Sequence, residues 1–326
     1  MFPSDLVEAG ADLGGLQPIA GRFEIEDDAV WFVPRFPFVA GRSYALLVSS
    51  DLGDKRPEVW HIQRPAPAGV PTTEVTAMYP DADEVPLNLL KLYVHFSSPM
   101  SEGWAGRAVH VRRADDDQPL ADVFLRMEPE LWDPDRRRLT LLLDPGRIKR
   151  GLAPHEQVGY PLIEGVPVVV SVDATFRDAA GQPLRSETRS VPLRTGFERR
   201  YAVGPAIRAR IDPAAWQLHL PAARSTEPLI VEFDRPLDHA LLEHCLSVND
   251  TAGVSVDGVG SADPGGRSWR FEPESPWKAG RYSLIVDSRL EDLAGNSLVR
   301  VFDRDLTRPA DTPAEARPVA IDFVCA

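Results

Sequence analysis

Two segments of the chain alternate apolar and polar residues in the way that a half-buried β-strand requires. Residues 92–101 read Leu-Tyr-Val-His-Phe-Ser-Ser-Pro-Met-Ser, and residues 229–238 read Leu-Ile-Val-Glu-Phe-Asp-Arg-Pro-Leu-Asp. In both, Leu, Val and Phe occupy every second position, so they point to one face of a strand. The proline that follows cannot donate a hydrogen bond to a sheet. The pattern therefore predicts the same strand and the same strand end twice.

Two further elements recur in the same order along the chain. Residues 31–44 and 269–282 each hold a strand that ends at proline, then Ala-Gly-Arg and a new strand near a tyrosine; residues 139–151 are a looser copy. Residues 178–184 and 292–298 both contain Asp-x-Ala-Gly. In such a turn the carboxylate accepts local N–H bonds and the glycine supplies a positive φ. These ordered repeats predict related structural units.

The repeats divide the chain into units at residues 1–66, 70–200 and 205–308, and a tail at 309–326 holds one more strand-like run. The linkers are expected at residues 64–69 and 201–205. The first unit lacks the opening strand, so it is a truncated domain or one that borrows a partner edge. Short strands separated by Pro and Gly turns, at about 100 residues per unit, predict an all-β fold of tandem antiparallel β-sandwiches.

The strand end Phe-x-x-Pro-apolar, the strand start Ala-Gly-Arg-Tyr and the Asp-x-Ala-Gly turn together resemble the bacterial Ig-like domains first described in S-layer proteins. Unit 205–308 fits the pattern along most of its length, unit 70–200 at its two ends, and unit 1–66 only in its second half. The resemblance implies tandem Ig-like sandwiches that serve as spacers or adhesive modules of secreted or surface proteins. It implies no activity, because function is carried by sites rather than by folds.

Composition narrows the classes of function. The chain has 326 residues, 43% of them hydrophobic, and no stretch approaches the ~20 apolar residues of a membrane span. A net charge of -13 gives no basic field for nucleic acid. The 31 prolines disfavour long helices. With only two cysteines, Cys245 and Cys325, the chain is no disulfide-dense scaffold, and whether the two pair stays open.

The compartment also stays open from the residues alone. Residues 1–6 lack the basic n-region and the apolar h-region of a signal peptide. The chain is either cytoplasmic or begins after a removed leader. Only the resemblance favours a secreted or envelope location.

The middle unit contains chemistry that the repeat does not require. One segment, residues 127–138, combines carboxylates with a tryptophan, and a second, residues 144–151, is cationic. Together they predict a groove for an anionic or sugar ligand, because arginine forks bind carboxylate or phosphate well. The candidate ligand-binding residues are Glu130, Trp132, Asp133, Arg147, Lys149 and Arg150.

This interpretation has plainer alternatives. Trp132 also suits a plug at the sandwich edge, with the charges in a solvated loop. Glu130 and Asp133 as an acid/base pair would need the separation and burial of a glycosidase pair, which a sequence does not give. No catalytic residue is assigned, since the chain has no Gly-x-Ser-x-Gly elbow and no phosphate-binding glycine loop.

The metal-ligating residue types form no recognisable set. His239 and His244 are five residues apart rather than four, and His95 would approach His110 only if their strands were neighbours. The acidic runs 81–84 and 115–117 lack the calcium-loop arrangement and are interpreted as solvated hairpin tips. No metal and no cofactor is assigned.

The sequence thus favours a non-catalytic binding or structural module of Ig-like sandwiches. Its partner would be a protein, a glycan or a small anionic ligand, with no nucleic acid and no membrane span. The alternative is an enzyme or small-molecule binder whose site lies in the elaborated middle unit.

Overall fold

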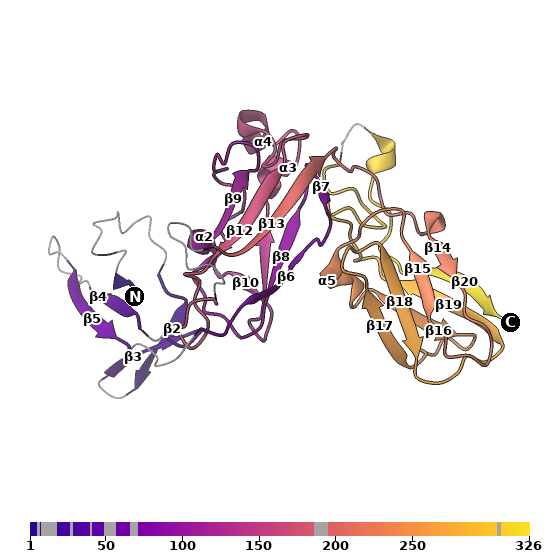
Figure 1. Cartoon of the computed structure of the whole chain (residues 1–326), viewed down its shortest axis with the longest axis horizontal. Coiled ribbons are helices and arrows are strands. Elements are labelled where there is room, and N and C mark those ends of the chain that lie inside the picture. The colour runs from indigo at the N-terminus through magenta and orange to yellow at the C-terminus, as the bar shows by residue number, and fades with distance from the viewer. Residues whose placement is uncertain are drawn as a thin grey trace.

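A computed structural model describes residues 1–4, 7, 18–26, 29–39, 41–48, 57–65, 71–185, 195–304 and 308–326. Three groups of strands follow one another along the long axis of the molecule (Figure 1). We call them the N-terminal strands, the middle sandwich and the C-terminal sandwich. The expected linker at 64–69 lies largely outside the described residues.

The N-terminal strands form two small antiparallel arrangements. A three-stranded sheet has the order β1 (Phe2–Pro3), β4 (Ser43–Val48), β5 (Glu58–Gln63), and a separate hairpin joins β2 (Gly21–Glu26) to β3 (Ala29–Pro34). They meet the middle sandwich through stacked cations, with Arg42 over Trp104 and Arg136 over Phe36. Trp104 belongs to the core of the middle sandwich, so Arg42 stacks on a ring at the edge of that core.

The middle sandwich consists of two four-stranded sheets. The first has the order β10 (Leu131–Trp132), β11 (Arg138–Leu142), β8 (Lys91–Phe96), β6 (Val75–Tyr79). The second has the order β7 (Glu84–Pro86), β13 (Thr195–Gly204), β12 (Val168–Asp173), β9 (Val109–Arg113). All pairs are antiparallel except β7 with β13.

The alternation in β8 fills the core as the sequence predicts. Leu92, Val94 and Phe96 are all buried. They pack with apolar residues of the facing sheet, including Val170 and Val172 of β12. Burying such side chains supplies most of the driving force that holds two sheets face to face.

The C-terminal sandwich also has two sheets and its own core. One sheet has the order β14 (Gln217–His219), β15 (Leu229–Glu232), β18 (Ser268–Pro273), β17 (Gly258–Ala262), and the other β16 (Leu246–Asp250), β19 (Gly280–Val286), β20 (Val319–Cys325). Its core contains Trp269, Trp277 and Phe323. The strand-like run of the tail is thus β20, the edge strand of the second sheet.

Helices are short and lie in the connections. Those that the structure describes in full are α2 (Ala105–Ala108), α3 (Pro145–Ile148), α4 (Ala153–Val158) and α5 (His239–Leu242), with 3₁₀ turns at Pro213–Ala215 and Pro309–Asp311. Across the described part of the chain, none of them has the length and apolar character to cross a bilayer. This architecture confirms the expected all-β fold of antiparallel sandwiches.

The two cysteines are free and buried. Cys325 pairs with Gly280 at one end of β19, whereas Leu246, the neighbour of Cys245, pairs with Val286 at the other end. A strand rises about 3.4 Å per residue, so the length of β19 separates the two thiols. They do not form an intramolecular disulfide.

We expect both thiols to be unreactive in the folded protein. Burial raises the pKa of Cys245 to about 11 and also raises the pKa of Cys325, and only the thiolate is a nucleophile. Ellman's reagent at pH 8 should detect both thiols after unfolding in guanidinium and neither within minutes under native conditions. A fast-reacting thiol in the native protein would contradict this burial.

Candidate functional site at the junction of the two sandwiches

The Asp-x-Ala-Gly turn of the C-terminal sandwich, residues 292–296, inserts into the middle sandwich; we call it the docking turn. Leu293 is buried within the core of the middle sandwich, and its carbonyl accepts a 2.9 Å hydrogen bond from the N–H of Leu90. Gly295 has a φ of +76° and lies so close to Leu90 that a Cβ there would collide with that side chain. Glycine is therefore needed both for the backbone conformation and for the close approach.

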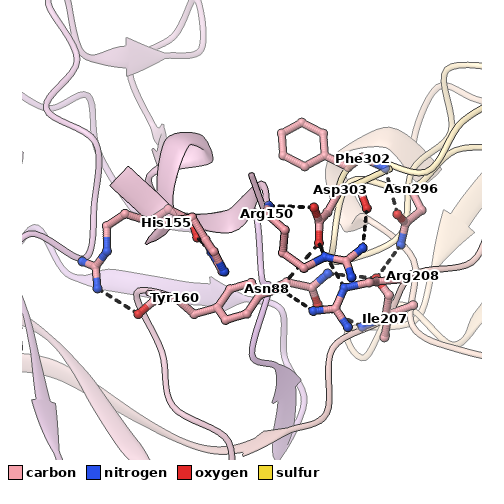
Figure 2. A network of polar contacts seen from close by, with 10 residues as sticks. Asn88, Arg150, His155, Tyr160, Ile207, Arg208, Asn296, Phe302 and Asp303 are labelled. Atoms are coloured by element: carbon pink, nitrogen blue, oxygen red, sulfur yellow. Dashed lines mark hydrogen bonds and ion pairs between the residues drawn. The ribbon is translucent and has the colours of Figure 1, made fainter. Parts of the chain in front are cut away.

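Two buried asparagines hold the chain between the sandwiches (Figure 2). Asn88, from the middle sandwich, donates to the carbonyl of Ile207 at 2.8 Å and accepts from its N–H at 3.0 Å. Asn296 of the docking turn donates to the same carbonyl at 3.1 Å. Because buried amides are costly unless they are bonded, this reciprocal pairing fixes the path of the linker.

A charged cluster lies beside the docking turn. The ammonium of Lys91 on β8 contacts Asp238 at 3.2 Å and Glu291 at 2.6 Å, and the hydroxyl of Tyr93 donates to Asp238 at 2.8 Å. Burial alone would lower the pKa of Lys91, but the two carboxylates together raise it above its ordinary value. Both lysine and tyrosine come from the middle sandwich and both carboxylates from the C-terminal one, so the charges pair only when the sandwiches are joined.

A second charged cluster surrounds Asp303, whose side chain is only 2% exposed. Arg150 donates to it from Nε at 2.7 Å and from its backbone N–H at 2.9 Å, and Arg208 donates from Nε at 3.0 Å. Figure 2 shows Arg150 and Arg208 converging on Asp303, with Tyr160 beside Arg208. Charge-assisted bonds of this kind are strong when they are shielded from water.

Aromatic rings lie next to the first charged cluster, because Tyr79 pairs with Tyr93 and His239 follows Asp238. Tyr79 of β6 stacks on His239 of α5 with ring centroids 3.7 Å apart, and His95 of β8 meets Tyr79 edge-on at 5.1 Å. Burial lowers the pKa of both histidines, so they are neutral at neutral pH. His110 is on β9 in the facing sheet, so the pairing of His95 with His110 does not occur.

A groove of about 650 Å³ opens where the second charged cluster reaches the surface. One wall is the loop between α3 and α4, residues 149–152, and the other is the segment 300–304 that follows the docking turn, with Pro313 at its margin. Its lining includes Lys149, Arg150, Arg300 and Arg304. The groove is thus cationic on a chain of net charge -13.

Of the six residues that the sequence singles out, Lys149 and Arg150 line this groove. Lys149 stacks over the ring of Phe302 at 4.3 Å. Arg147 lies nearby but binds backbone carbonyls, those of Gly159 and Tyr160 among them. Arg147 therefore holds the loop around α4 in place.

The other three residues lie at the far end of β11. Trp132 packs against Phe96 and Phe176 and donates from Nε1 to Glu130 at 2.9 Å. Glu130 also accepts from the N–H of Ala105 at 2.8 Å, and burial raises its pKa. Because β11 separates the two groups, the six residues do not share one pocket.

Asp133 stays near that end and accepts from the backbone N–H groups of Arg137 and Arg138. It thereby closes the turn before β11. An aspartate that accepts from backbone N–H groups a few residues later in the chain is typical of a self-capped turn.

The junction residues that the sequence analysis missed are Asn88, Lys91, Tyr93, Asp238, Glu291 and Asp303. Asp238 had one visible signal, because it follows the strand-ending proline and caps α5 through the N–H of Leu241. The others are single polar residues within apolar or loop segments. Nothing in a single chain's local pattern says that they face a neighbouring unit.

The acidic runs are used in ion pairs. Asp115 and Asp117, both exposed, pair with Arg113 and Arg112 at the end of β9, and Asp81 pairs with Arg199. Within the described ranges, no three His, Cys, Asp or Glu side chains gather in a way that would hold a metal ion.

Comparison with known proteins identifies no family. No protein-family model matches the chain, and no curated protein matches it. Among solved structures it is similar to Escherichia coli alpha-2-macroglobulin domains MG0-NIE-MG1, at 10% identity and a TM-score of 0.25, over 78% of this chain and 71% of that one. It is also similar to the S-layer protein rSbsC, at 8% identity and a TM-score of 0.27, over 78% of this chain and 41% of that one. The third is the chicken CNTN1 FN1–FN3 domains, at 10% identity and a TM-score of 0.23, over 94% of this chain and 85% of that one. Values this low transfer no function to this chain.

We expect the docking turn to give stability a pH dependence. Burial raises the pKa of Asp292 from 3.8 to about 6, against bonds from Asn296 and the nearby Arg235. The pKa of Asp292 is higher in the folded protein than in the unfolded one. The contribution of Asp292 to the free energy of unfolding is therefore complete below about pH 4 and is lost as the pH rises through about 6. The free energy of unfolding of the wild type, minus that of D292N, should fall by about 2–3 kcal/mol between pH 4 and pH 7.

Urea denaturation at four pH values measures this difference. D178N, in the equivalent turn of the middle sandwich, controls for the loss of an aspartate from an Asp-x-Ala-Gly turn. If the free energy of unfolding of the wild type minus that of D292N stays constant or grows as the pH rises, then docking does not desolvate Asp292.

Proposed function

We propose that the chain is a non-catalytic bacterial Ig-like structural and binding module of a secreted or envelope-associated protein. In this proposal units 70–200 and 205–308, with the final strand, act as one rigid rod, and unit 1–66 is a partial domain that precedes them. The observation that carries it is the docking turn, which puts Leu293 of one sandwich into the hydrophobic core of the other.

The buried polar contacts support a rigid junction. Ion pairs and amide bonds cross from one sandwich to the other at Lys91, Asn88 and Arg150. Breaking the junction would separate Asp238 from Lys91 and Asp303 from Arg150, while Arg208 would stay with Asp303. Ion pairs that are shielded from water hold their geometry more strongly than exposed ones. A flexible string of domains would instead join its units through exposed linkers with few contacts.

The use of the reactive side chains favours a non-catalytic role. Glu130 and Asp133 accept backbone N–H bonds, and Arg147 donates to backbone carbonyls. Each of these groups is occupied in holding a loop of the middle sandwich. Such side chains stabilise the structure of their own loops rather than being placed to contact a substrate.

A distance measurement between the sandwiches tests the rigid rod. Spin labels at E164C and E274C, both exposed positions, should give one narrow distance distribution in electron–electron double resonance. L293A should broaden it, because a small side chain leaves the docking turn without its apolar anchor. The native cysteines are buried and should stay unlabelled.

L218A is the matched control, since Leu218 packs against the core of the C-terminal sandwich alone. It should leave the distribution narrow while lowering the melting temperature. A broad distribution in the otherwise unmodified chain, as wide as that of L293A, would contradict a rigid junction.

A further inference from the structure

The groove at the junction has an excess of positive charge. Among the described residues of its lining, four side chains are cationic and one, Asp303, is a carboxylate. That carboxylate is buried and already shared by Arg150 and Arg208. Of the lining cations, Arg300 also lies 3.6 Å from Glu291. Asp303 and Glu291 are thus both already engaged by cations.

Two of the lining cations, Lys149 and Arg304, stand apart from the carboxylates that the structure describes. Among the residues that the structure describes, neither Lys149 nor Arg304 lies within ion-pair distance of a carboxylate. Lys149 rests over the ring of Phe302, which leaves its ammonium unneutralised, and Arg304 is exposed. Like charges that line one concavity repel one another, and a bound anion relieves that repulsion.

The side chain of Arg150 is fixed in an orientation that suits ligand binding. Its Nε and its backbone N–H both donate to Asp303, so its side chain is oriented from behind while remaining 41% exposed. A guanidinium fixed in this way loses little conformational freedom when it binds an oxyanion. Asp303 is in this sense a positioning residue for the groove.

The rest of the lining is apolar. Leu152, Val301, Phe302 and Pro313 contribute side chains between the charges. Such a surface suits a ligand with a partly apolar body, because small-molecule sites combine apolar walls with a few placed polar groups.

We propose that this groove binds a small anionic ligand that carries carboxylate or phosphate groups on a compact body, with Lys149, Arg150 and Arg304 as its anion-binding residues. Both sandwiches contribute to the groove, so a bound ligand would bridge them and stabilise the junction. The inference goes beyond the rigid-rod proposal and does not depend on it, since Lys149 and Arg304 take no part in the docking turn.

Titration calorimetry of the full chain at fixed ionic strength tests the inference. The probes are inorganic phosphate, citrate, trigalacturonate and the uncharged trisaccharide of galactose. At least one anion should bind with a 1:1 stoichiometry, and the neutral sugar should not. Tighter binding of phosphate would point to phosphate esters as the ligand class, and tighter binding of trigalacturonate to acidic saccharides.

The double variant K149Q/R304Q should weaken anion binding at least fivefold. The matched control R270Q/K278Q removes the same charge from exposed positions on the C-terminal sandwich outside the groove, and should change the affinity less than twofold. Equal weakening by both variants, no anion binding by the wild type, or equal binding of the neutral sugar would each overturn the proposal. Inter-label distances in K149Q/R304Q should match those of the wild type, so a failed groove is distinguishable from a failed rod.

Discussion

The arrangement of the two complete sandwiches depends on the insertion of Leu293 into the core of the middle sandwich. A leucine that crosses between units removes apolar surface from water only when the units are in one orientation, and the backbone bond from Leu90 to Leu293 fixes the same orientation. Each charged cluster includes a carboxylate close to the docking turn in the chain, Glu291 before it and Asp303 after it. They can be dehydrated because the docking turn already excludes water from the junction. The groove follows in turn, because one of its walls is the segment that continues from the docking turn.

The buried charges give specificity to a contact that the leucine stabilises. Dehydrating Lys91, Asp238 and Glu291 costs free energy, and their mutual attraction offsets this cost only where they meet. In a misaligned pair of sandwiches these charged groups would lose water without meeting their partners. Wrong orientations are therefore destabilised by more than the right orientation is stabilised. Asn88 and Asn296 act similarly, since their amides find partners only when Ile207 passes between them. The junction is therefore selective in geometry even where its net stabilisation is small.

The sequence predicts the sandwiches well and the junction poorly, for a physical reason. Alternation in Leu92–Phe96 reports which side chains face the core of their own unit, so fold class follows from local pattern. Pro99 marks the end of the strand only loosely, since β8 ends at Phe96 and Met100 still pairs with Asp178. Pro145 shows the limit of this reasoning. It does follow strand β11, but the side chain of Asp144 accepts from the N–H of Gly146 and Pro145 opens helix α3. The proline thus has a second use, because it suits the first position of a helix. Asn88 and Lys91 face another unit, and no local periodicity encodes that. Of the candidate site, the cationic loop at Lys149 and Arg150 is found from composition, whereas its second wall, 150 residues later in the chain, requires the folded structure.

The two copies of the Asp-x-Ala-Gly turn show how little sequence separates an ordinary turn from a docking turn. In both, the aspartate accepts the backbone N–H groups two and four residues later, at Ala180 and Gln182 in one and at Ala294 and Asn296 in the other. The second residue differs: Ala179 is partly exposed, whereas Leu293 is buried in the neighbouring core. A methyl group at that place offers too little apolar surface to hold a neighbouring domain against the entropy of fixing it. The turn is therefore common to the middle and C-terminal sandwiches, and only its second copy has a side chain at the second position that is buried in a neighbouring core.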